Sequence, residues 1–265
     1  MITTIMTLMS VAVHSQNPYR LSAGAREVGL AYATSATTGF WSSFHNQASL
    51  AYMTSLSIGA NQDNRFGLAE LSNKTFGFIL PSAHGSLGAI YSYYGYTDYS
   101  RHSAGLAYGM KIGKIISIGV QADLFSTRRA LDYENTNELT CEIGILVKPV
   151  KGLSVGLHTF NPIPDRIRKL EMPTIITLGA GYLFSDTFLT AIDLESSDTG
   201  HTNLRIGMEL KAYENFFLRG GLMSNPSGIS FGFGYSGNVL QGNLGFITHE
   251  NLGLTPSLSI VIFIR

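Results

Sequence analysis

The sequence is poor in charge and in cysteine, and it has no long apolar run. Charged residues make up 14% of the 265, with 18 basic and 18 acidic side chains. A chain of zero formal charge lacks the basic surface that a nucleic-acid partner requires, so we expect no such partner. The single cysteine, Cys141, excludes an internal disulfide and a cysteine-rich metal site. No apolar run reaches the ~18 residues of a transmembrane helix.

Glycine and aromatic residues are abundant instead. The chain has 29 glycines, 15 phenylalanines and 13 tyrosines, against one tryptophan. Low charge combined with many glycines and aromatics, and without an apolar helix, is typical of a transmembrane β-barrel. A soluble β-sandwich shows the same alternation of apolar and polar residues and is the alternative.

Apolar and polar residues alternate with a period of two over residues 55–265. In the clearest stretch, Ile116 and Val120 share one face while Gln121 and Asp123 share the other. The pattern recurs about every fifteen residues, which suits about fourteen strands of the roughly 9–11 residues that cross a bilayer. We therefore predict an all-β transmembrane barrel of antiparallel strands over this range. Its lipid-facing side chains are expected to include Ile116, Val120, Ile206, Phe231 and Ile260.

The chain before residue 55 differs from the rest. Residues 1–15 are apolar and end in small residues, so we interpret them as a secretory signal peptide, with a first β-strand as the alternative. Residues 16–54 are expected to form a short helical plug inside the barrel, because Phe40, Phe44 and Ala48 recur at helical spacing. The residues assigned to the plug are Arg26, Trp41, Phe44, His45, Asn46 and Leu50.

The inner face of the strands carries charged residues of both signs. A basic side chain in lipid would cost roughly 2–4 kcal/mol at the bilayer midplane, so we expect these residues to face a hydrated interior. Because positive and negative charges nearly balance, we expect these side chains to pair with one another. We do not expect an ion-selective pore, which needs an excess of one sign. The lumen residues singled out are Asp123, Glu142, Arg205, Glu209 and Arg219. The plug residues expected to hydrogen-bond to the lumen are Arg26, Glu27 and Asn46.

Two short motifs in the plug resemble those of the FadL/PorV-type outer-membrane barrels. Residues 23–29 read AGAREVG, similar to the family's AGAR-x-x-G, and residues 46–51 read NQASLA, similar to its N-P-A-G-L-A. Gln47 and Ser49 replace the proline and the glycine of the second motif. The resemblance implies a barrel of about fourteen strands in the bacterial outer membrane with an N-terminal hatch, and a source among the Bacteroidota. A surface helix that matches the motif by chance is the alternative.

No residue pattern points to catalysis. Residues 228–232 match G-x-S-x-G, but they lie in an alternating stretch, without the strand-to-helix turn that exposes a catalytic serine. Ser154 and His158 share a strand face at a separation of about 13 Å, too far for a hydrogen bond. No histidine pair has close metal-ligand spacing. We expect no metal, no cofactor and no enzymatic activity.

Two functions remain open. The resemblance implies either an accessory barrel of the PorV/PorQ kind, related to type IX protein secretion, or a FadL-like importer of hydrophobic small molecules. Short connections and the missing proline at Gln47 favour the accessory barrel, whose partners would be outer-membrane lipid and a protein of an outer-membrane complex. The longest connection, residues 160–173, is stiffened by prolines and is the candidate partner surface. Its basic tip consists of Arg166, Arg168 and Lys169.

Overall fold

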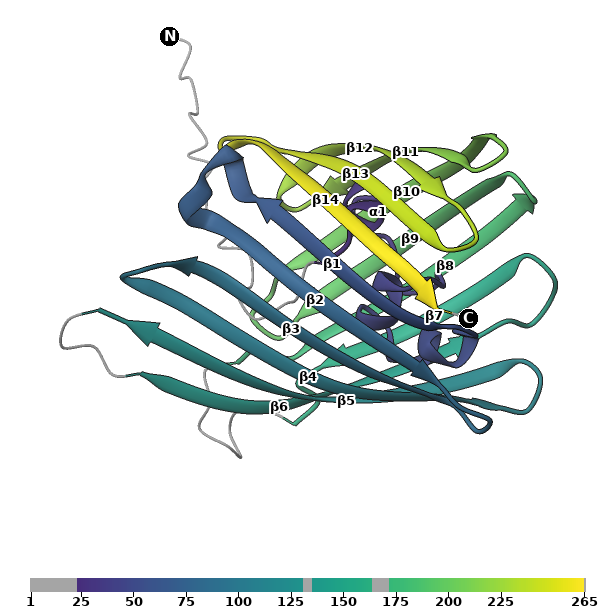
Figure 1. Ribbon diagram of the computed structural model, residues 1–265, viewed down its shortest axis with the longest axis horizontal. Helices are drawn as coiled ribbons and strands as arrows, with labels where there is room; N and C mark the ends of the chain where they lie inside the picture. Colours follow the sequence, from purple (N-terminus) through teal and green to yellow (C-terminus); the bar gives the residue numbers. More distant parts are fainter. Residues whose placement is uncertain (1–22, 131–134, 164–171, 265) are drawn as a thin grey trace, which may run out of the picture.

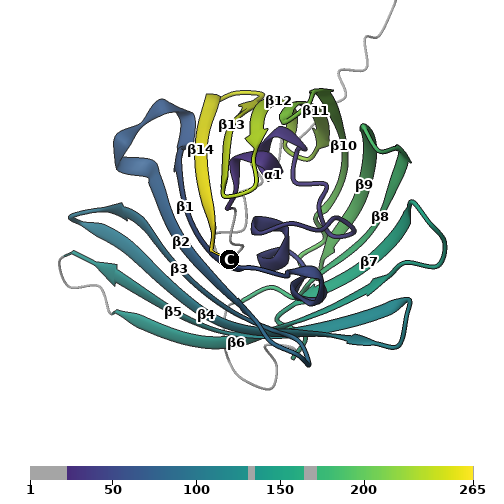
Figure 2. The same cartoon turned by 45° about the vertical axis from the view of Figure 1, so that its right-hand side comes forward.

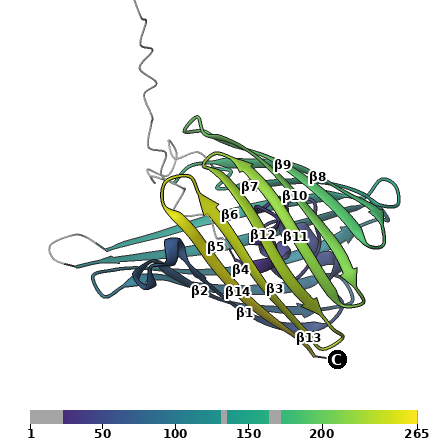
Figure 3. The same cartoon turned by 90° about the horizontal axis from the view of Figure 1, so that it is seen from above.

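Fourteen antiparallel strands form a closed barrel, as the alternation in the sequence predicts. The structure is a computed structural model and describes residues 23–130, 135–163 and 172–264. Each strand pairs with its neighbours in the sequence, and β1 closes the wall by pairing with β14, where Ala60 lies opposite Ile260. Figures 1 and 3 show this continuous wall from two sides. The proposed signal peptide, residues 1–15, lies outside the described residues.

The strands follow one another with short connections. Their bounds are β1 Leu56–Asn64, β2 Ser72–Pro81, β3 Ser86–Tyr96, β4 Tyr99–Ile112, β5 Ile116–Arg129, β6 Thr136–Val147, β7 Leu153–Phe160, β8 Ile175–Ser185, β9 Phe188–Ser197, β10 Thr202–Tyr213, β11 Phe216–Ser224, β12 Ser227–Ser236, β13 Leu240–His249 and β14 Gly253–Ile264.

Side chains alternate between the outside and the inside of the wall. In β12, Phe231 is 41% exposed on the outer face, whereas Ser230 next to it is 2% exposed. The outer face is apolar along every strand, and a closed sheet leaves no unpaired edge, which is what a bilayer requires of a spanning β-structure. These two features exclude the soluble sandwich. Within the described residues, none of the helices has the length and apolarity needed to span a bilayer.

The two ends of the barrel differ in their connections. At one end, here called the loop end, lie the longer connections 65–71, 130–135 and 161–174. At the other, the turn end, strands are joined by short turns such as 113–115 and 186–187. The C-terminus marks the turn end in Figure 1. Strand β1 also starts there, because Leu56 lies opposite Ile264.

Residues 23–54, which precede β1, lie inside the barrel (Figure 2). We call residues 23–54 the inner segment. It contains the α-helix α1 Ala25–Gly29 and two 3₁₀-helices, η1 Trp41–Phe44 and η2 Gln47–Tyr52. The sequence predicts one helix across the last two, but the backbone breaks between them. Asn46 is extended there, with φ −150° and ψ 107°, and its side chain accepts a hydrogen bond from the Ala48 N–H as the N-cap of η2.

Glycines on the inner face of the wall make room for the inner segment. A Cβ on Gly207 would lie 2.6 Å from the Leu30 carbonyl oxygen, and one on Gly221 would lie 2.9 Å from the Ala31 Cβ. On the opposite side, a Cβ on Gly109 would lie 2.7 Å from the Leu50 Cβ. Backbone and small side chains of the segment therefore lie directly against the strands, and the glycines are required by this close approach.

Candidate functional site

The candidate site is the interface between the inner segment and the barrel lumen, because the ion pairs of the described residues lie there. Its centre is Glu209 on β10. Arg26 from α1 donates two parallel hydrogen bonds to this carboxylate, from Nε to Oε2 and from Nη2 to Oε1, both at 2.8 Å. Arg219 on β11 donates a third from Nε at 2.6 Å and bonds Asn243 through Nη1 at 3.0 Å. Paired guanidinium–carboxylate bonds of this kind fix geometry as well as charge.

Glu27 lies beside this cluster but bonds within the inner segment. Its Oε1 accepts a hydrogen bond of 2.7 Å from the Ser42 hydroxyl and lies 3.6 Å from Arg26 Nη1. The Arg26 Nη1 also donates to the Ser42 hydroxyl oxygen at 3.2 Å. The sequence predicts a lumen partner for Glu27. Its partners, Ser42 and Arg26, instead belong to the inner segment, and they tie α1 to η1.

A second anchor is Asp193 on β9, which the alternation of the sequence places on the inner face of the wall. Its Oδ2 accepts hydrogen bonds from the backbone N–H groups of Thr34, at 3.0 Å, and Ser35, at 2.9 Å. Its Oδ1 accepts from the Ser35 hydroxyl at 2.7 Å. One wall carboxylate thus holds a whole turn of the inner segment. The inward position of Asp193 was predictable from the alternation, but its partner was not.

A third anchor lies at η2. Asn46 Nδ2 donates to two carbonyl oxygens, that of Ser35 at 2.6 Å and that of Ile145 on β6 at 3.2 Å. Gln47 Nε2 donates to Glu142 Oε2 at 2.5 Å. His158 Nε2 shares the same carboxylate oxygen at 2.9 Å.

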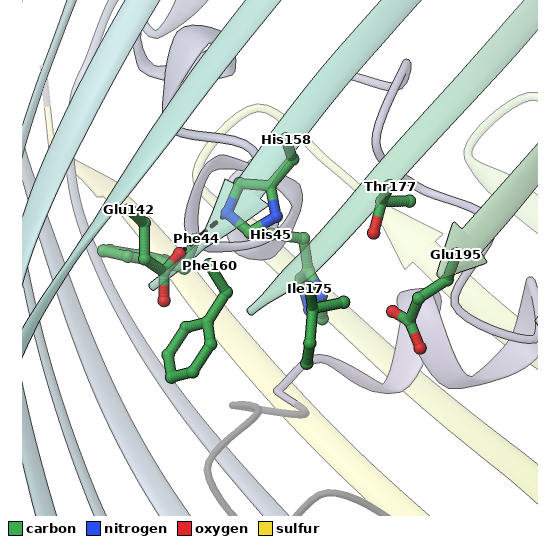
Figure 4. A pocket seen from close by; sticks show the side chains of 8 residues that line it. All are labelled: Phe44, His45, Glu142, His158, Phe160, Ile175, Thr177 and Glu195. Atoms are coloured by element: carbon green, nitrogen blue, oxygen red, sulfur yellow. Dashed lines mark hydrogen bonds and ion pairs between the residues drawn. The ribbon is translucent and has the colours of Figure 1, made fainter. Parts of the chain in front are cut away.

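Glu142 and His158 border a small cavity of about 10 Å³ between the inner segment and β6–β9 (Figure 4). Phe44 and His45 reach it from the inner segment, and the other lining residues come from the wall. A space of this size holds about one water molecule. The cavity is therefore a packing gap in a polar interface and does not have the size of a ligand site.

The remaining lumen residues form separate pairs. Arg205, on the same strand as Glu209, donates from Nη2 to Glu195 Oε1 on β9 at 2.5 Å. Asp123 Oδ1 accepts from Gln121 Nε2 at 2.7 Å on its own strand. The five charged residues singled out in the lumen therefore do not form one cluster. Glu209 and Arg219 bond to each other, whereas Arg205 bonds to Glu195, because strand register and the course of the inner segment decide which side chains meet.

Apolar side chains of the inner segment pack against one side of the wall. Trp41, Phe44 and Leu50 are each at most 2% exposed and share a cluster with Ile79 and Val261 of the wall. His45 lies next to them, and its Nε2 makes a 2.8 Å hydrogen bond with the Ala23 carbonyl oxygen. Its role here is to join the two ends of the inner segment.

Three larger cavities lie between the inner segment and the two ends of the barrel. One of about 70 Å³ opens near the loop end. Two of about 470 and 220 Å³ lie towards the turn end, and Arg26 lines both. Within the described residues there is no group of three or more His, Cys, Asp or Glu side chains arranged to hold a metal ion. The basic tip Arg166, Arg168 and Lys169 lies outside the described residues.

The fold is shared with solved outer-membrane channels. The structure titled CymD monoaromatic hydrocarbon channel aligns with a TM-score of 0.70 and 13% identity, over 92% of this chain and 98% of that one. A FadL homologue from Pseudomonas aeruginosa aligns at 0.65 and 11% identity, over 92% and 99% of the two chains. The toluene transporter TbuX from Ralstonia pickettii aligns at 0.61 and 10%, over 88% and 96%. No family model matches the chain. No curated protein sequence matches it either.

These likenesses, at low sequence identity, identify the architecture as a FadL-type barrel. Together with the apolar outer face of a closed barrel, they place the chain in the bacterial outer membrane, as expected. The finer resemblance to PorV/PorQ proteins and the Bacteroidota source receive no support from them. The similar structures are described as channels and transporters, not as enzymes.

Proposed function

We propose that the protein passes small hydrophobic molecules through the outer membrane, with the inner segment acting as a movable plug. The observation that carries this proposal is a cavity at the loop end that has one apolar side and that is bordered by Tyr32 of the inner segment. It is the alternative function named from the sequence. The FadL-type fold supports it over the secretion accessory, for which neither the fold nor the described residues offer an argument.

Orientation follows from the connections. Outer-membrane barrels have short periplasmic turns and longer extracellular loops. By this rule the loop end faces the outside of the cell and the turn end faces the periplasm. A molecule arriving from outside would therefore meet the cavity at the loop end first.

The lining of this cavity is half apolar and half polar, and its polar residues are Asp63, Arg65, Thr248, His249 and Thr255. Phe66 comes from the β1–β2 connection, Met223 and Pro226 come from the end of β11 and the turn after it, and Ile247 comes from β13. Tyr32 of the inner segment lies below them. In sites for small molecules, apolar side chains of this kind surround the body of the ligand, and polar groups fix its orientation.

The size of the cavity argues that the inner segment moves. At about 70 Å³ it is smaller than the ~150 Å³ cavity that takes up benzene in an engineered protein core. Ala31 and Tyr32, at its floor, both have positive φ, at 51° and 60°. Such backbone conformations are strained for residues with a Cβ and persist only where the surroundings hold them. Displacement of this turn would relieve the backbone strain at Ala31 and Tyr32 and would also enlarge the cavity.

The test is uptake of radiolabelled toluene by a bacterial host that lacks a FadL-type channel of its own. Cells that make the wild-type protein should show saturable uptake above cells that do not. Met223→Trp should fill the cavity and lower uptake several-fold. The control is Met208→Trp, since Met208 points outward from β10 and is 49% exposed. Uptake at the level of the empty host, or equal uptake by both variants, would refute the proposal.

A further inference from the structure

The last residue of η2 lies between two lysines at the turn end. The Nζ of Lys148 lies 3.6 Å from the centroid of the Tyr52 ring, and the Nζ of Lys111 lies 4.6 Å from it. Lys111 belongs to the end of β4, and Lys148 follows the end of β6. Both side chains project to the inner side of the wall, in line with the buried residues Gly109 and Leu146 two positions before each of them.

This pair of ammonium groups has no acidic partner. Among the ion pairs of the described residues, none involves Lys111 or Lys148. Burial, and then the charge of Lys111, lower the pKa of Lys148. The Tyr52 ring stabilises the ammonium groups by a cation–π interaction, which compensates a charge only in part. The site therefore keeps an excess of positive charge on the inner side of the barrel mouth.

A cavity lies directly beside Lys148. Its volume is about 470 Å³, within the range of small-molecule sites. One side is apolar, with Leu153, Leu183 and Leu189 from β7, β8 and β9. No carboxylate lines the cavity.

The other side of the cavity is polar and cationic. Thr37 and Thr38 of the inner segment contribute hydroxyl groups, and Lys148, Lys151 and Arg26 contribute positive charge. Arg26 is already neutralised by Glu209, so the lysines remain as the groups that can receive an anion. Charge-assisted hydrogen bonds from such groups to a carboxylate are among the stronger polar contacts in proteins.

We propose that this cavity at the turn end is a binding site for a small amphipathic organic anion. Its carboxylate bonds to Lys148 and Lys151, and its apolar body lies against the leucines of β7–β9. The mixed lining selects against a bare inorganic anion, which would leave the apolar side unused, and against a neutral hydrocarbon, which would leave the lysines unpaired. The site does not depend on the passage function, because binding is measured on the purified protein.

The experiment is calorimetric titration of the full chain in detergent with 4-phenylbutyrate as the probe. We expect saturable binding by the wild type, with an affinity at least tenfold higher than for 4-phenylbutan-1-ol or inorganic phosphate. Lys148→Met should weaken 4-phenylbutyrate about tenfold or more, as expected for loss of a charged hydrogen bond. Lys211→Met is the matched control, because Lys211 also faces inward near the turn end, on β10, and does not line the cavity.

Heat-modifiable migration on gels verifies that each variant is a folded barrel. The proposal is overturned if the folded wild type binds no 4-phenylbutyrate at millimolar concentration. It is also overturned if Lys148→Met and Lys211→Met bind as the wild type does, or if the alcohol or phosphate binds as tightly as the carboxylate.

Discussion

Arg26 and Glu209 join the inner segment to the wall through two hydrogen bonds of 2.8 Å. The same carboxylate accepts a bond from Arg219, so one wall acid pairs with one guanidinium of the inner segment and one of the wall. All three side chains are at most 12% exposed. Glu209 therefore supplies the negative charge that pairs with both guanidinium groups at the interface between the inner segment and the wall.

Glu209→Gln should loosen the inner segment without unfolding the barrel. The amide keeps the shape of the side chain but leaves two buried guanidiniums without their main counter-charge. Removing one partner of a buried ion pair typically destabilises by about 3–5 kcal/mol. Hydrogen exchange of residues 23–54 should accelerate by at least a hundredfold, while exchange in the strands stays slow. Glu214→Gln, in the exposed β10–β11 turn, is the control, and equal exchange in both variants would contradict the assignment.

A wall glycine provides a steric test of the same interface. On β5, a Cβ at Gly119 would overlap backbone atoms of Gln47 and Ala48, which are not free to rotate away as a side chain end is. Gly119→Ala should therefore displace η2, destabilise the folded protein by about 1–3 kcal/mol and raise ion conductance in planar bilayers. Gly242→Ala is the matched control, because a Cβ there meets open space. Equal conductance of the two variants would show that η2 does not occlude the lumen.

Strand number and facing were predictable because they depend on a local pattern. The alternation around Val120 and Gln121 fixes which face each side chain takes, whatever the partner strands are. The contrast between residues 16–54 and the strands also pointed to an element of another kind before β1. A stretch of a few residues is enough to predict such features, because they do not depend on which other strands lie nearby.

Partners across the lumen were not predictable. Asp193 meets the turn at Thr34, and Lys111 and Lys148 meet Tyr52, only because the barrel closes with a given register and the inner segment follows a given path. Such contacts join residues far apart in the sequence. Before the structure was known, the sequence could show only that Lys111, two residues after Gly109, faces inward.

The facing of β5 can be tested with labels in a Cys141→Ser background. Val120 is 52% exposed on the outer face and Gln121 is 3% exposed on the inner face. A nitroxide at Val120→Cys should be accessible to oxygen, which concentrates in lipid, and one at Gln121→Cys should not. Water-like accessibility at both positions would contradict a membrane-spanning wall.

The movement of the plug can be tested with a reversible covalent link between Ala36 of the inner segment and Gly181 of β8. A Cβ on Gly181 would lie 3.8 Å from the Ala36 Cβ, which matches the mean spacing of about 3.8 Å in disulfides. Ala36→Cys with Gly181→Cys, in a Cys141→Ser background, should form this bond on oxidation. Since passage requires displacement of the segment, oxidised cells should lose saturable toluene uptake, and a reductant should restore it. Gly181→Cys alone should be insensitive to oxidation. Undiminished uptake by a fully oxidised double variant would mean that molecules pass the plug without moving it at residue 36, and the movable plug would have to be abandoned.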